Sequence, residues 1–327
     1  MAAGTDLDDL VARARDGSPR AVARLISLVE DGGPLVRDLA AALAPHTGHA
    51  VVVGLTGSPG VGKSTTTSAL VSALRADDRR VGVLAVDPSS PFSGGALLGD
   101  RVRMSEHATD PGVFIRSMAT RGHLGGLAAA APQALRVLDA AGCDVVLVET
   151  VGVGQSEVEV VALADTTVVL LAPGMGDGVQ AAKAGVLEIA DVFCVNKADR
   201  EGADAAVREV QNAMAMSRRG TGPRWRIPVV RTVASAGEGV DELLAAIDAH
   251  RAWTVEHGRG DEGRRRRARA EVEAIALADL RAQLRAVSGS AALDALAAEV
   301  AGGGLDPFAA ADRLRAAATS ADGVDGR

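Results

Sequence analysis

A glycine-rich loop between an apolar run and a helical pattern constrains the fold of this chain more than any other feature. The run AVVVGL, residues 50–55, leads into GSPGVGKS, residues 57–64, which fits the pattern G-x-x-x-x-G-K-[ST]. Glycines let the backbone N–H groups of such a loop approach a phosphate closely, and a helix beginning near Lys63 adds the positive end of its dipole. The junction therefore predicts a phosphate site at the end of a strand in an α/β sheet.

The loop supplies candidate ligands for the phosphates of a nucleotide. They are Gly57, Ser58, Pro59, Gly60, Val61, Gly62, Lys63, Ser64 and Thr65. In this pattern Lys63 neutralises the β- and γ-phosphate oxygens, Ser64 ligates Mg²⁺ and Thr65 reaches the α-phosphate. A chance match to the bare pattern is expected on the order of once per hundred chains. The strand and helix that flank this loop make a chance match rarer still.

Seven short apolar runs follow one another between residues 50 and 250, and helical patterns separate most of them. They lie at residues 50–55, 81–86, 113–118, 144–149, 166–173, 191–197 and 227–234. This alternation predicts an α/β fold with right-handed crossovers and a doubly wound, mostly parallel sheet. Aromatic residues make up only 2% of the chain, so aliphatic side chains must fill the core, which suits parallel strands covered on both faces.

A second motif lies at the end of the apolar run 191–197. The motif is N-K-x-D, and its residues are Asn196, Lys197, Ala198 and Asp199. A carboxylate here can accept hydrogen bonds from N1–H and the exocyclic N2–H₂ of guanine, whereas adenine would leave it unpaired. A small loop that can lie against the guanine carbonyl follows the last apolar run, at Ser235, Ala236 and Gly237. The two motifs together predict a site for GTP or GDP.

Acidic residues end two other apolar runs. Asp87 follows the run 81–86, and Glu149 ends the run 144–149. In a parallel sheet both carboxylates lie at the carboxyl edge near the phosphate loop, where ligands of doubly wound sheets bind. Mg²⁺ prefers hard oxygen ligands and keeps several waters, so one or two carboxylates suffice. Glycine-rich loops follow Asp87, Glu149 and the run 166–173, and we expect them to rearrange when a γ-phosphate leaves.

Composition divides the chain into three expected domains. Residues 1–49 read as an N-terminal helical extension, 50–250 as a P-loop GTPase domain, and 251–327 as a C-terminal helical dimerisation arm and tail. The arm carries a narrow apolar seam at helical spacing, made of Leu277, Leu280, Leu284 and Val287. A seam of this kind on an otherwise polar helix predicts a homodimer. The alternative is that the seam packs on the chain's own GTPase domain.

Composition also argues against several classes of protein. Scarce aromatic rings argue against a base-stacking nucleic-acid platform, and a net charge of −7 argues against a generally basic nucleic-acid binder. Cys143 and Cys194 lie in or beside apolar runs, as is typical of buried thiols in a reducing compartment. No apolar run approaches the ~20 residues that span a bilayer, and the acidic N-terminal sequence is unlike a signal peptide. We expect a soluble, cytoplasmic protein without nucleic-acid or membrane partners.

Five segments together resemble the MeaB/ArgK family of G proteins, whose human relative is the methylmalonic aciduria type A protein. They are residues 57–65, AVDPSS at 85–90, GGALLGDRVRM at 94–104, ETVGVGQSE at 149–157 and NKAD at 196–199. The resemblance covers roughly residues 5–290. It implies a GTPase chaperone that gates cofactor delivery to methylmalonyl-CoA mutase, or to a related adenosylcobalamin-dependent acyl-CoA mutase, and protects or reactivates that enzyme.

The resemblance also implies roles for individual residues. Lys63 and Ser64 would contact the phosphates and Mg²⁺, and Asp199 would read the base. The residues that it places in the metal and hydrolysis region are Asp87, Asp100 and Glu149. The segment 177–185 matches an additional switch that relays the nucleotide state to the mutase. The chain differs from its relatives at residues 273–276, where Glu-Ala-Ile-Ala replaces an aromatic cluster.

Slow hydrolysis is a further expectation. An arginine finger contributes about 10³–10⁵ in rate, and no arginine is obviously placed at the γ-phosphate by the motifs above. Arg101 and Arg103, just after Asp100, are the candidates for a finger within this chain. We therefore expect a slow intrinsic rate that a partner raises.

Three other functions stay open. Some ArgK proteins are called transport-associated kinases, but phosphotransfer to a protein needs an acceptor surface and a positioned base, of which the sequence shows no sign. A nickel-insertion accessory GTPase needs His or Cys tracts, and here only His46 and His49 lie close together. A pure binding module would hold the nucleotide with scarcely any turnover.

Overall fold

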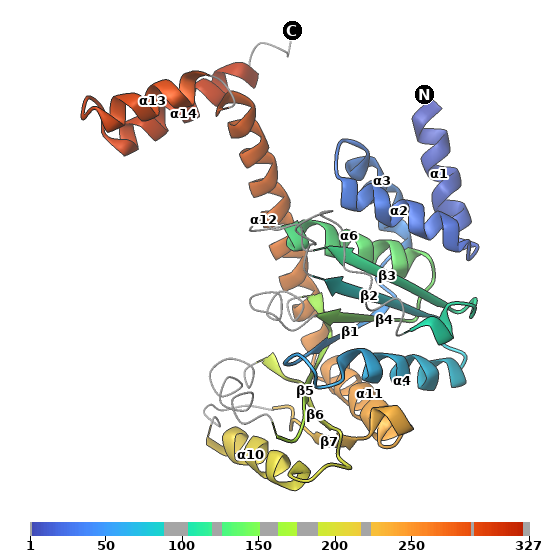
Figure 1. The fold of residues 1–327 in the computed structure, drawn as a ribbon. Helices are drawn as coiled ribbons and strands as arrows, with labels where there is room; N and C mark the ends of the chain where they lie inside the picture. The colour runs from blue at the N-terminus through green and yellow to red at the C-terminus, as the bar shows by residue number, and fades with distance from the viewer. Residues whose placement is uncertain are drawn as a thin grey trace. The chain divides into compact units, whose positions relative to one another are not determined.

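The computed structural model describes residues 2–87, 104–119, 126–150, 163–174, 189–216, 224–288 and 291–322. The chain divides into two compact units, Met1–Arg267 and Ala268–Arg327. The first unit contains a β-sheet with helices on both faces, and the second is helical where it is described (Figure 1). The three domains expected from composition stay a prediction.

Within the described residues, seven parallel strands form the sheet of the first unit, in the order β3-β2-β4-β1-β5-β6-β7. Their bounds are β1 Val51–Thr56, β2 Val81–Asp87, β3 Val113–Ala119, β4 Val145–Thr150, β5 Thr166–Leu171, β6 Val192–Asn196 and β7 Val229–Thr232. The chain leaves β1 outward to β2 and β3, returns to β4 on one side of β1, and continues from β5 on the other side. The predicted doubly wound parallel sheet is confirmed. Its order reverses at β1, where such sheets bind ligands at the carboxyl ends of their strands.

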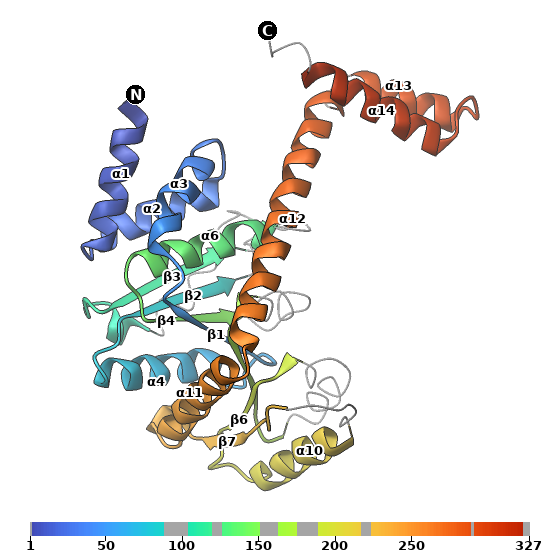
Figure 2. The same cartoon turned by 180° about the vertical axis from the view of Figure 1, so that it is seen from behind.

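Helices cover both faces of this sheet (Figures 1 and 2). On one face lie α1 Ala2–Arg15, α2 Pro19–Asp31, α3 Leu35–Leu43, α6 Gly126–Ala140 and α10 Ala203–Met216, and on the other α4 Lys63–Ala76 and α11 Val240–Glu256. The alternation of side chains along β5 explains this arrangement. Val168 and Leu170 join the core beneath α4 and α11, whereas Val169 and Leu171 pack with Val210 of α10.

The start of α2 follows from its local sequence. The side chain of Ser18 accepts a hydrogen bond of 3.4 Å from the N–H of Ala21, and Pro19 occupies the first turn. The buried residues of this helix are Ala21, Val22, Leu25, Ile26 and Val29. Both the cap and the buried face agree with the helical pattern in the sequence.

In the described part of the chain, four aspartates that are distant in sequence from their partners stabilise the edge of the sheet where its strands begin. Each accepts a hydrogen bond from a backbone N–H at or just before a strand: Asp139 from Ala50 (2.9 Å), Asp144 from Arg80 (2.7 Å), Asp165 from Val52 (2.9 Å) and Asp191 from Thr167 (2.8 Å). Backbone groups at these positions need partners, and a carboxylate is a strong acceptor. The edge opposite the phosphate loop is therefore held by charge-assisted hydrogen bonds.

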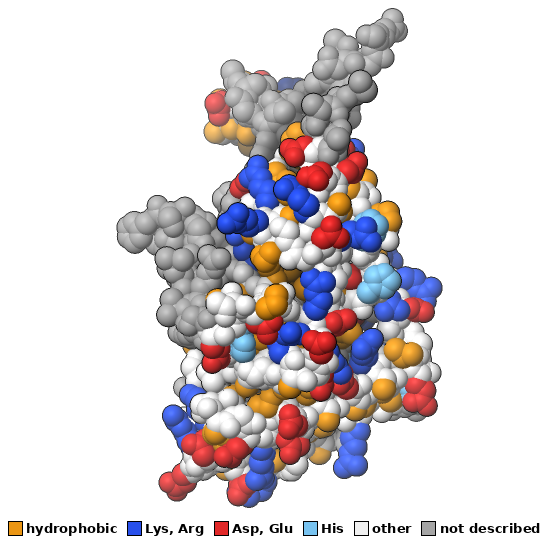
Figure 3. All heavy atoms as spheres, turned by 90° about the vertical axis from the view of Figure 1, so that its right-hand side faces the viewer, with side chains coloured by type: hydrophobic (Ala, Val, Ile, Leu, Met, Phe, Trp, Pro, Cys, Tyr) orange, Lys and Arg blue, Asp and Glu red, His pale blue; other side chains and the backbone are white. Residues whose placement is uncertain are grey.

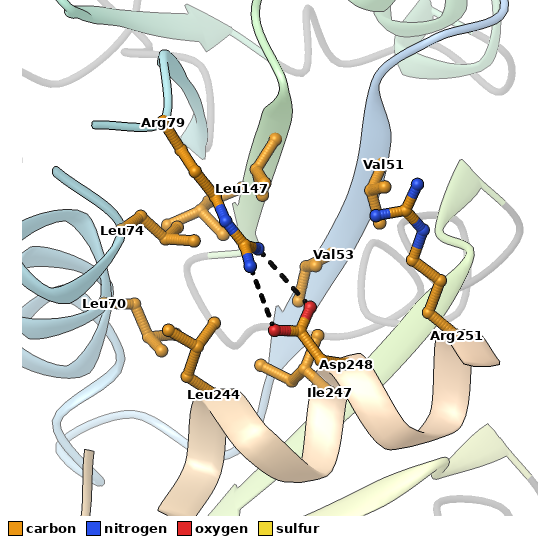
Figure 4. Close-up of a pocket in the computed structure, with 11 residues that line it drawn as sticks. Val51, Val53, Leu70, Leu74, Arg79, Leu147, Leu244, Ile247, Asp248 and Arg251 are labelled. Atoms are coloured by element: carbon orange, nitrogen blue, oxygen red, sulfur yellow. Dashed lines mark hydrogen bonds and ion pairs between the residues drawn. The ribbon is translucent and has the colours of Figure 1, made fainter. Parts of the chain in front are cut away.

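Helices α4 and α11 lie side by side over β1 and β4 and leave a small, largely apolar recess between them (Figure 4). Arg79 and Asp248 face each other at this recess and form two hydrogen bonds of 3.4 and 3.2 Å. The hydrogen bond with Asp248 raises the pKa of Arg79 above its ordinary value. This ion pair joins α11 to the turn that follows α4.

The second unit holds the later part of α12 Arg259–Ser288, together with α13 Ala291–Ala301 and α14 Pro307–Asp322. Helices α13 and α14 pack against each other, and Arg313 pairs with Glu299 at 3.2 Å.

Acidic and basic side chains are interspersed over the face of the molecule drawn in Figure 3. Among the helices described, none is both long and apolar enough to cross a bilayer.

Candidate functional site

The phosphate loop connects the end of β1 to the first turn of α4. Gly57, Gly60 and Gly62 have φ angles of 144°, 80° and 98°, which side-chain-bearing residues rarely adopt. A Cβ atom at Gly57 would collide with the carbonyl oxygen of Leu170, and one at Gly62 would collide with Nδ2 of Asn196. The loop therefore needs glycine at these two positions for its backbone and for the space around it.

Lys63 and Ser64 begin α4, as the motif predicts. The Nζ of Lys63 donates to the carbonyl oxygens of Gly57 at 2.6 Å and Ser58 at 3.2 Å, so the ammonium group stays within the loop. The hydroxyl of Ser64 donates to Oε1 of Glu149 at 2.6 Å. Only 2% of Glu149 is exposed, so this carboxylate is buried beside the loop.

Asn196, at the end of β6, connects the N-K-x-D segment to the phosphate loop. Its Nδ2 donates to the carbonyl oxygen of Val61 at 2.9 Å. Its Oδ1 accepts from the hydroxyl of Thr232 and from the N–H of Ala234, both at 3.1 Å. One buried amide thus joins the phosphate loop, the end of β7 and the small loop that follows it.

The rest of the N-K-x-D segment is more open. Lys197 has a φ of 57°, and its Nζ donates to the carbonyl oxygen of Gly60 at 2.6 Å. Asp199 is exposed, as are Ser235 and Ala236 in the small loop, where Gly237 ends η3 (Ala234–Ala236) in a left-handed conformation. The Asp199 side chain is therefore accessible from solvent.

Several predicted residues cannot be placed. Asp87 ends β2, paired in register with Ala119, but its side chain lies outside the described part of the chain. Asp100, Arg101 and Arg103 lie wholly outside it, as do the glycine-rich segments 88–95 and 151–157 and the segment 177–185. Among the predicted residues that the structure describes, hydrogen bonds join Lys63 to Gly57 and Ser58, Asn196 to Val61, and Lys197 to Gly60. Ser64 pairs with Glu149.

The donor atoms beside the loop suit Mg²⁺. The Ser64 hydroxyl and the Glu149 carboxylate are hard oxygen donors, and Mg²⁺ needs few protein ligands because it keeps waters. Among the described residues, His, Cys, Asp and Glu side chains do not gather in a metal-binding group of three or more. Burial raises the pKa of Cys143 to about 12 and that of Cys194 to about 11. Thiols that stay protonated are poor ligands for nickel or zinc.

Reasoning from the sequence missed one residue of this site, Thr67. Its hydroxyl lies 3.0 Å from Oε2 of Glu149 and 3.0 Å from the carbonyl oxygen of Lys63. Thr67 stands three residues after Ser64 on α4, so the two side chains share one face of the helix. That spacing could have identified Thr67 once Ser64 was assigned.

Comparison with known proteins gives consistent results. Residues 22–288 match the family described as methylmalonyl Co-A mutase-associated GTPase MeaB. A relative in Pyrococcus abyssi, named as a GTPase, is 48% identical over 309 residues, which cover 94% of this chain and 95% of that protein. The mouse mitochondrial methylmalonic aciduria type A homolog is 42% identical over 194 residues, 58% of this chain and 46% of that protein. The crystal structure of an LAO/AO transport system kinase has a TM-score of 0.69 at 27% identity and covers 95% of this chain and 97% of its own.

Proposed function

Because the chain belongs to the MeaB family of GTPases, we propose that it is a Mg²⁺-dependent G protein that serves an adenosylcobalamin-dependent acyl-CoA mutase. The proposed client is methylmalonyl-CoA mutase or a sister enzyme. The protein would gate cofactor loading and protect or reactivate the mutase. The family's description as mutase-associated and the relative named for methylmalonic aciduria both support this partner.

The bridge made by Asn196 is the observation that carries the nucleotide assignment. It fastens the N-K-x-D segment to the carbonyl oxygen of Val61 in the phosphate loop. A nucleotide whose phosphates lie in the loop then has its base within reach of the same segment. Asp199 in that segment suits guanine, because an ionised carboxylate only accepts hydrogen bonds and guanine offers two donors on one edge.

In the proposed reaction, the residues of this chain act mainly by placing positive charge and hydrogen-bond donors around the phosphates. Lys63 would neutralise the β- and γ-phosphates, and the N–H groups of the loop would orient them. Ser64 and Glu149 would hold Mg²⁺, and Asp87 and Asp100 are the further candidates for this role. The bound ion would supply positive charge to the phosphate oxygens.

Single-turnover hydrolysis tests the proposal. We expect the isolated full-length protein to hydrolyse GTP slowly, and the added mutase to raise the rate, because an arginine finger supplied by a partner is worth about 10³–10⁵. Lys63→Ala, the control, should abolish hydrolysis in both conditions. Turnover of several GTP per second without a partner, or equal use of ATP and GTP, would contradict the proposal.

A kinase is the second candidate, because a structurally similar protein is named a transport system kinase. The two activities differ in where the γ-phosphate goes. With γ-labelled GTP, a GTPase releases all the label as inorganic phosphate, whereas a kinase leaves label on an acceptor protein. We expect release alone.

A further inference from the structure

The carboxylate of Glu149 is held by two hydroxyl groups of the same helix. Ser64 donates to Oε1 at 2.6 Å, and Thr67 donates to Oε2 at 3.0 Å. Thr67 is fully buried and Glu149 is 2% exposed, so water does not compete for these bonds. A hydroxyl at each oxygen defines both the position and the plane of the carboxylate.

The Thr67 hydroxyl has one hydrogen and two acceptors within reach. One is the carbonyl oxygen of Lys63, one turn earlier, and the other is the Glu149 carboxylate. A bond to the carbonyl is what a buried threonine makes in an ordinary helix. A bond to an ionised acceptor is roughly twice as strong as one between neutral groups, so the carboxylate is the favoured acceptor.

A second anchor matters for a glutamate in particular. Its side chain has one more rotatable bond than that of aspartate, so more conformational freedom must be lost to fix its carboxylate. Ser64 restrains one carboxylate oxygen and Thr67 restrains the other. The Thr67 hydroxyl therefore contributes to ordering the Glu149 side chain before an ion binds.

We propose that Thr67 is a positioning residue that holds the Glu149 carboxylate against Ser64 and thereby sets the affinity of the nucleotide site for Mg²⁺. The inference rests on the proposed function, because it takes Ser64 and Glu149 as the magnesium-binding groups. Thr67 acts through Glu149 and does not touch the ion or the nucleotide. Partners of metal ligands typically contribute about 10–100-fold in metal affinity.

Magnesium titrations of GDP binding test this role in the full-length protein. Calorimetry gives the dissociation constant of GDP with a chelator and at increasing Mg²⁺ concentrations. We expect Thr67→Val to raise the Mg²⁺ concentration of half-maximal effect by about 10–100-fold. The same variant should leave GDP affinity in the chelator unchanged, because the phosphate loop and Asp199 are intact. Thr67→Ser, which keeps the hydroxyl, should behave as the wild-type protein.

Thr66→Val is the matched control. Thr66 is also fully buried on α4, and its hydroxyl donates to the carbonyl oxygen of Gly62 at 3.0 Å. This variant removes one buried hydroxyl from the same helix but not the anchor of Glu149. It should leave the Mg²⁺ midpoint in place. If Thr67→Val unfolds, Thr67→Ala carries the same test with a better helix former.

A double-mutant cycle makes the test specific. In a Glu149→Gln background, Thr67→Val should produce no further shift of the Mg²⁺ midpoint. A shift that persists there, or an equal shift in Thr66→Val, would overturn the inference. So would a loss of GDP affinity in the chelator that matches the loss with Mg²⁺. Failure of the mutase to stimulate hydrolysis would contradict the proposed function and leave this result intact.

Discussion

At the scale of single residues, Asp199 decides which base the site accepts. Asp199→Asn should weaken GTP binding by at least about 100-fold. The amide cannot accept both hydrogen bonds that guanine donates to the carboxylate, so a polar group is left unpaired in the site. The same variant should bind xanthosine triphosphate more tightly than the wild-type protein does, since the amide can donate to the xanthine oxygen. Competition calorimetry with GTP, ATP and xanthosine triphosphate measures the change. Equal binding of ATP and GTP by the wild-type protein would refute the assignment.

Gly62 tests the geometry of the phosphate loop. Gly62→Ala puts a Cβ atom against Nδ2 of Asn196 and keeps a φ of 98°, so we expect a loss of about 10–100-fold in GDP affinity. Gly60→Ala is the matched control, because Gly60 has a similar φ of 80° but its Cβ would meet no atom within 4 Å. Calorimetric titration with GDP compares the two. Equal losses would show that strain alone, and not the contact with Asn196, explains the effect.

Among the secondary-structure elements, a polar cluster joins β5, the start of β6 and α11 at the sheet edge opposite the phosphate loop, with His250 buried and Asp191 partly buried. His250 of α11 lies with Nδ1 2.8 Å from the hydroxyl of Thr166 and with Nε2 3.3 Å from Oδ1 of Asp191. Burial lowers the pKa of His250 to about 4 and raises that of Asp191 to about 6. A neutral imidazole satisfies both contacts by accepting at Nδ1 and donating from Nε2.

These two pKa shifts act on stability in opposite directions. As the pH falls from 6.5, the ordinary pKa of histidine, to about 4, His250 is protonated in the unfolded chain but not in the folded protein. The free energy of unfolding therefore decreases over this range. From pH 6 to 3.8, folded Asp191 takes up a proton before the unfolded chain does, so stability rises. In the wild-type protein the two contributions therefore largely cancel between pH 6 and pH 4.

Asp191→Asn should expose the contribution of His250. Without the carboxylate, the melting temperature should fall more steeply between pH 6.5 and pH 4.5 than that of the wild-type protein, because only the His250 member of this pair still titrates. Thermal unfolding followed by circular dichroism across this range measures the slopes. A second substitution, His250→Gln, should remove the extra slope. Parallel curves for the wild-type and Asp191→Asn proteins would contradict the coupling.

The elements themselves could largely be predicted. Buried parallel strands appear in the sequence as apolar runs, and each of the seven runs overlaps one strand. The last run, 227–234, contains only Val229–Thr232, because Pro228 lacks an N–H group and β7 is an edge strand with a single neighbour. Helical spacing indicates that Thr67 shares a face of α4 with Ser64, but neither its contact with Glu149 nor the contacts of the aspartates at the opposite edge could be predicted. Such contacts join residues 24 to 113 positions apart without any periodic signal.

At the scale of the whole molecule, the exposed apolar side chains of α12 bear on assembly. Leu277 is 45% exposed and Leu280 is 55% exposed within this chain. The side chains of Leu284 and Val287, which complete the predicted seam, lie outside the described part. The predicted contact between two copies through this seam stays a prediction, for which these two exposed leucines are the described candidates.

Leu277→Asp combined with Leu280→Asp should therefore give a folded monomer that still binds GTP. Two carboxylates in an apolar contact would have to lose their hydration, so the dimer would be strongly disfavoured. Analytical ultracentrifugation at micromolar concentration, with and without nucleotide, measures the assembly state. Val255→Asp, on α11 at 72% exposure, is a control that should leave the dimer in place. A wild-type protein that sediments as a monomer would disprove the prediction.

The aromatic residues around His250 have a consequence for spectroscopy. Trp225 and Trp253 are the two tryptophans of the chain, which contains no tyrosine. The centroids of the two indole rings are 5.9 Å apart. Trp253 stacks on His257 with 4.6 Å between ring centroids, and the guanidinium of Arg259, at the start of α12, lies 5.9 Å from the centroid of the Trp253 ring. Nearly all of the intrinsic ultraviolet fluorescence of the protein therefore originates near the junction of α11 and α12. The protein thus carries an unlabelled optical reporter at the junction of α11 and α12.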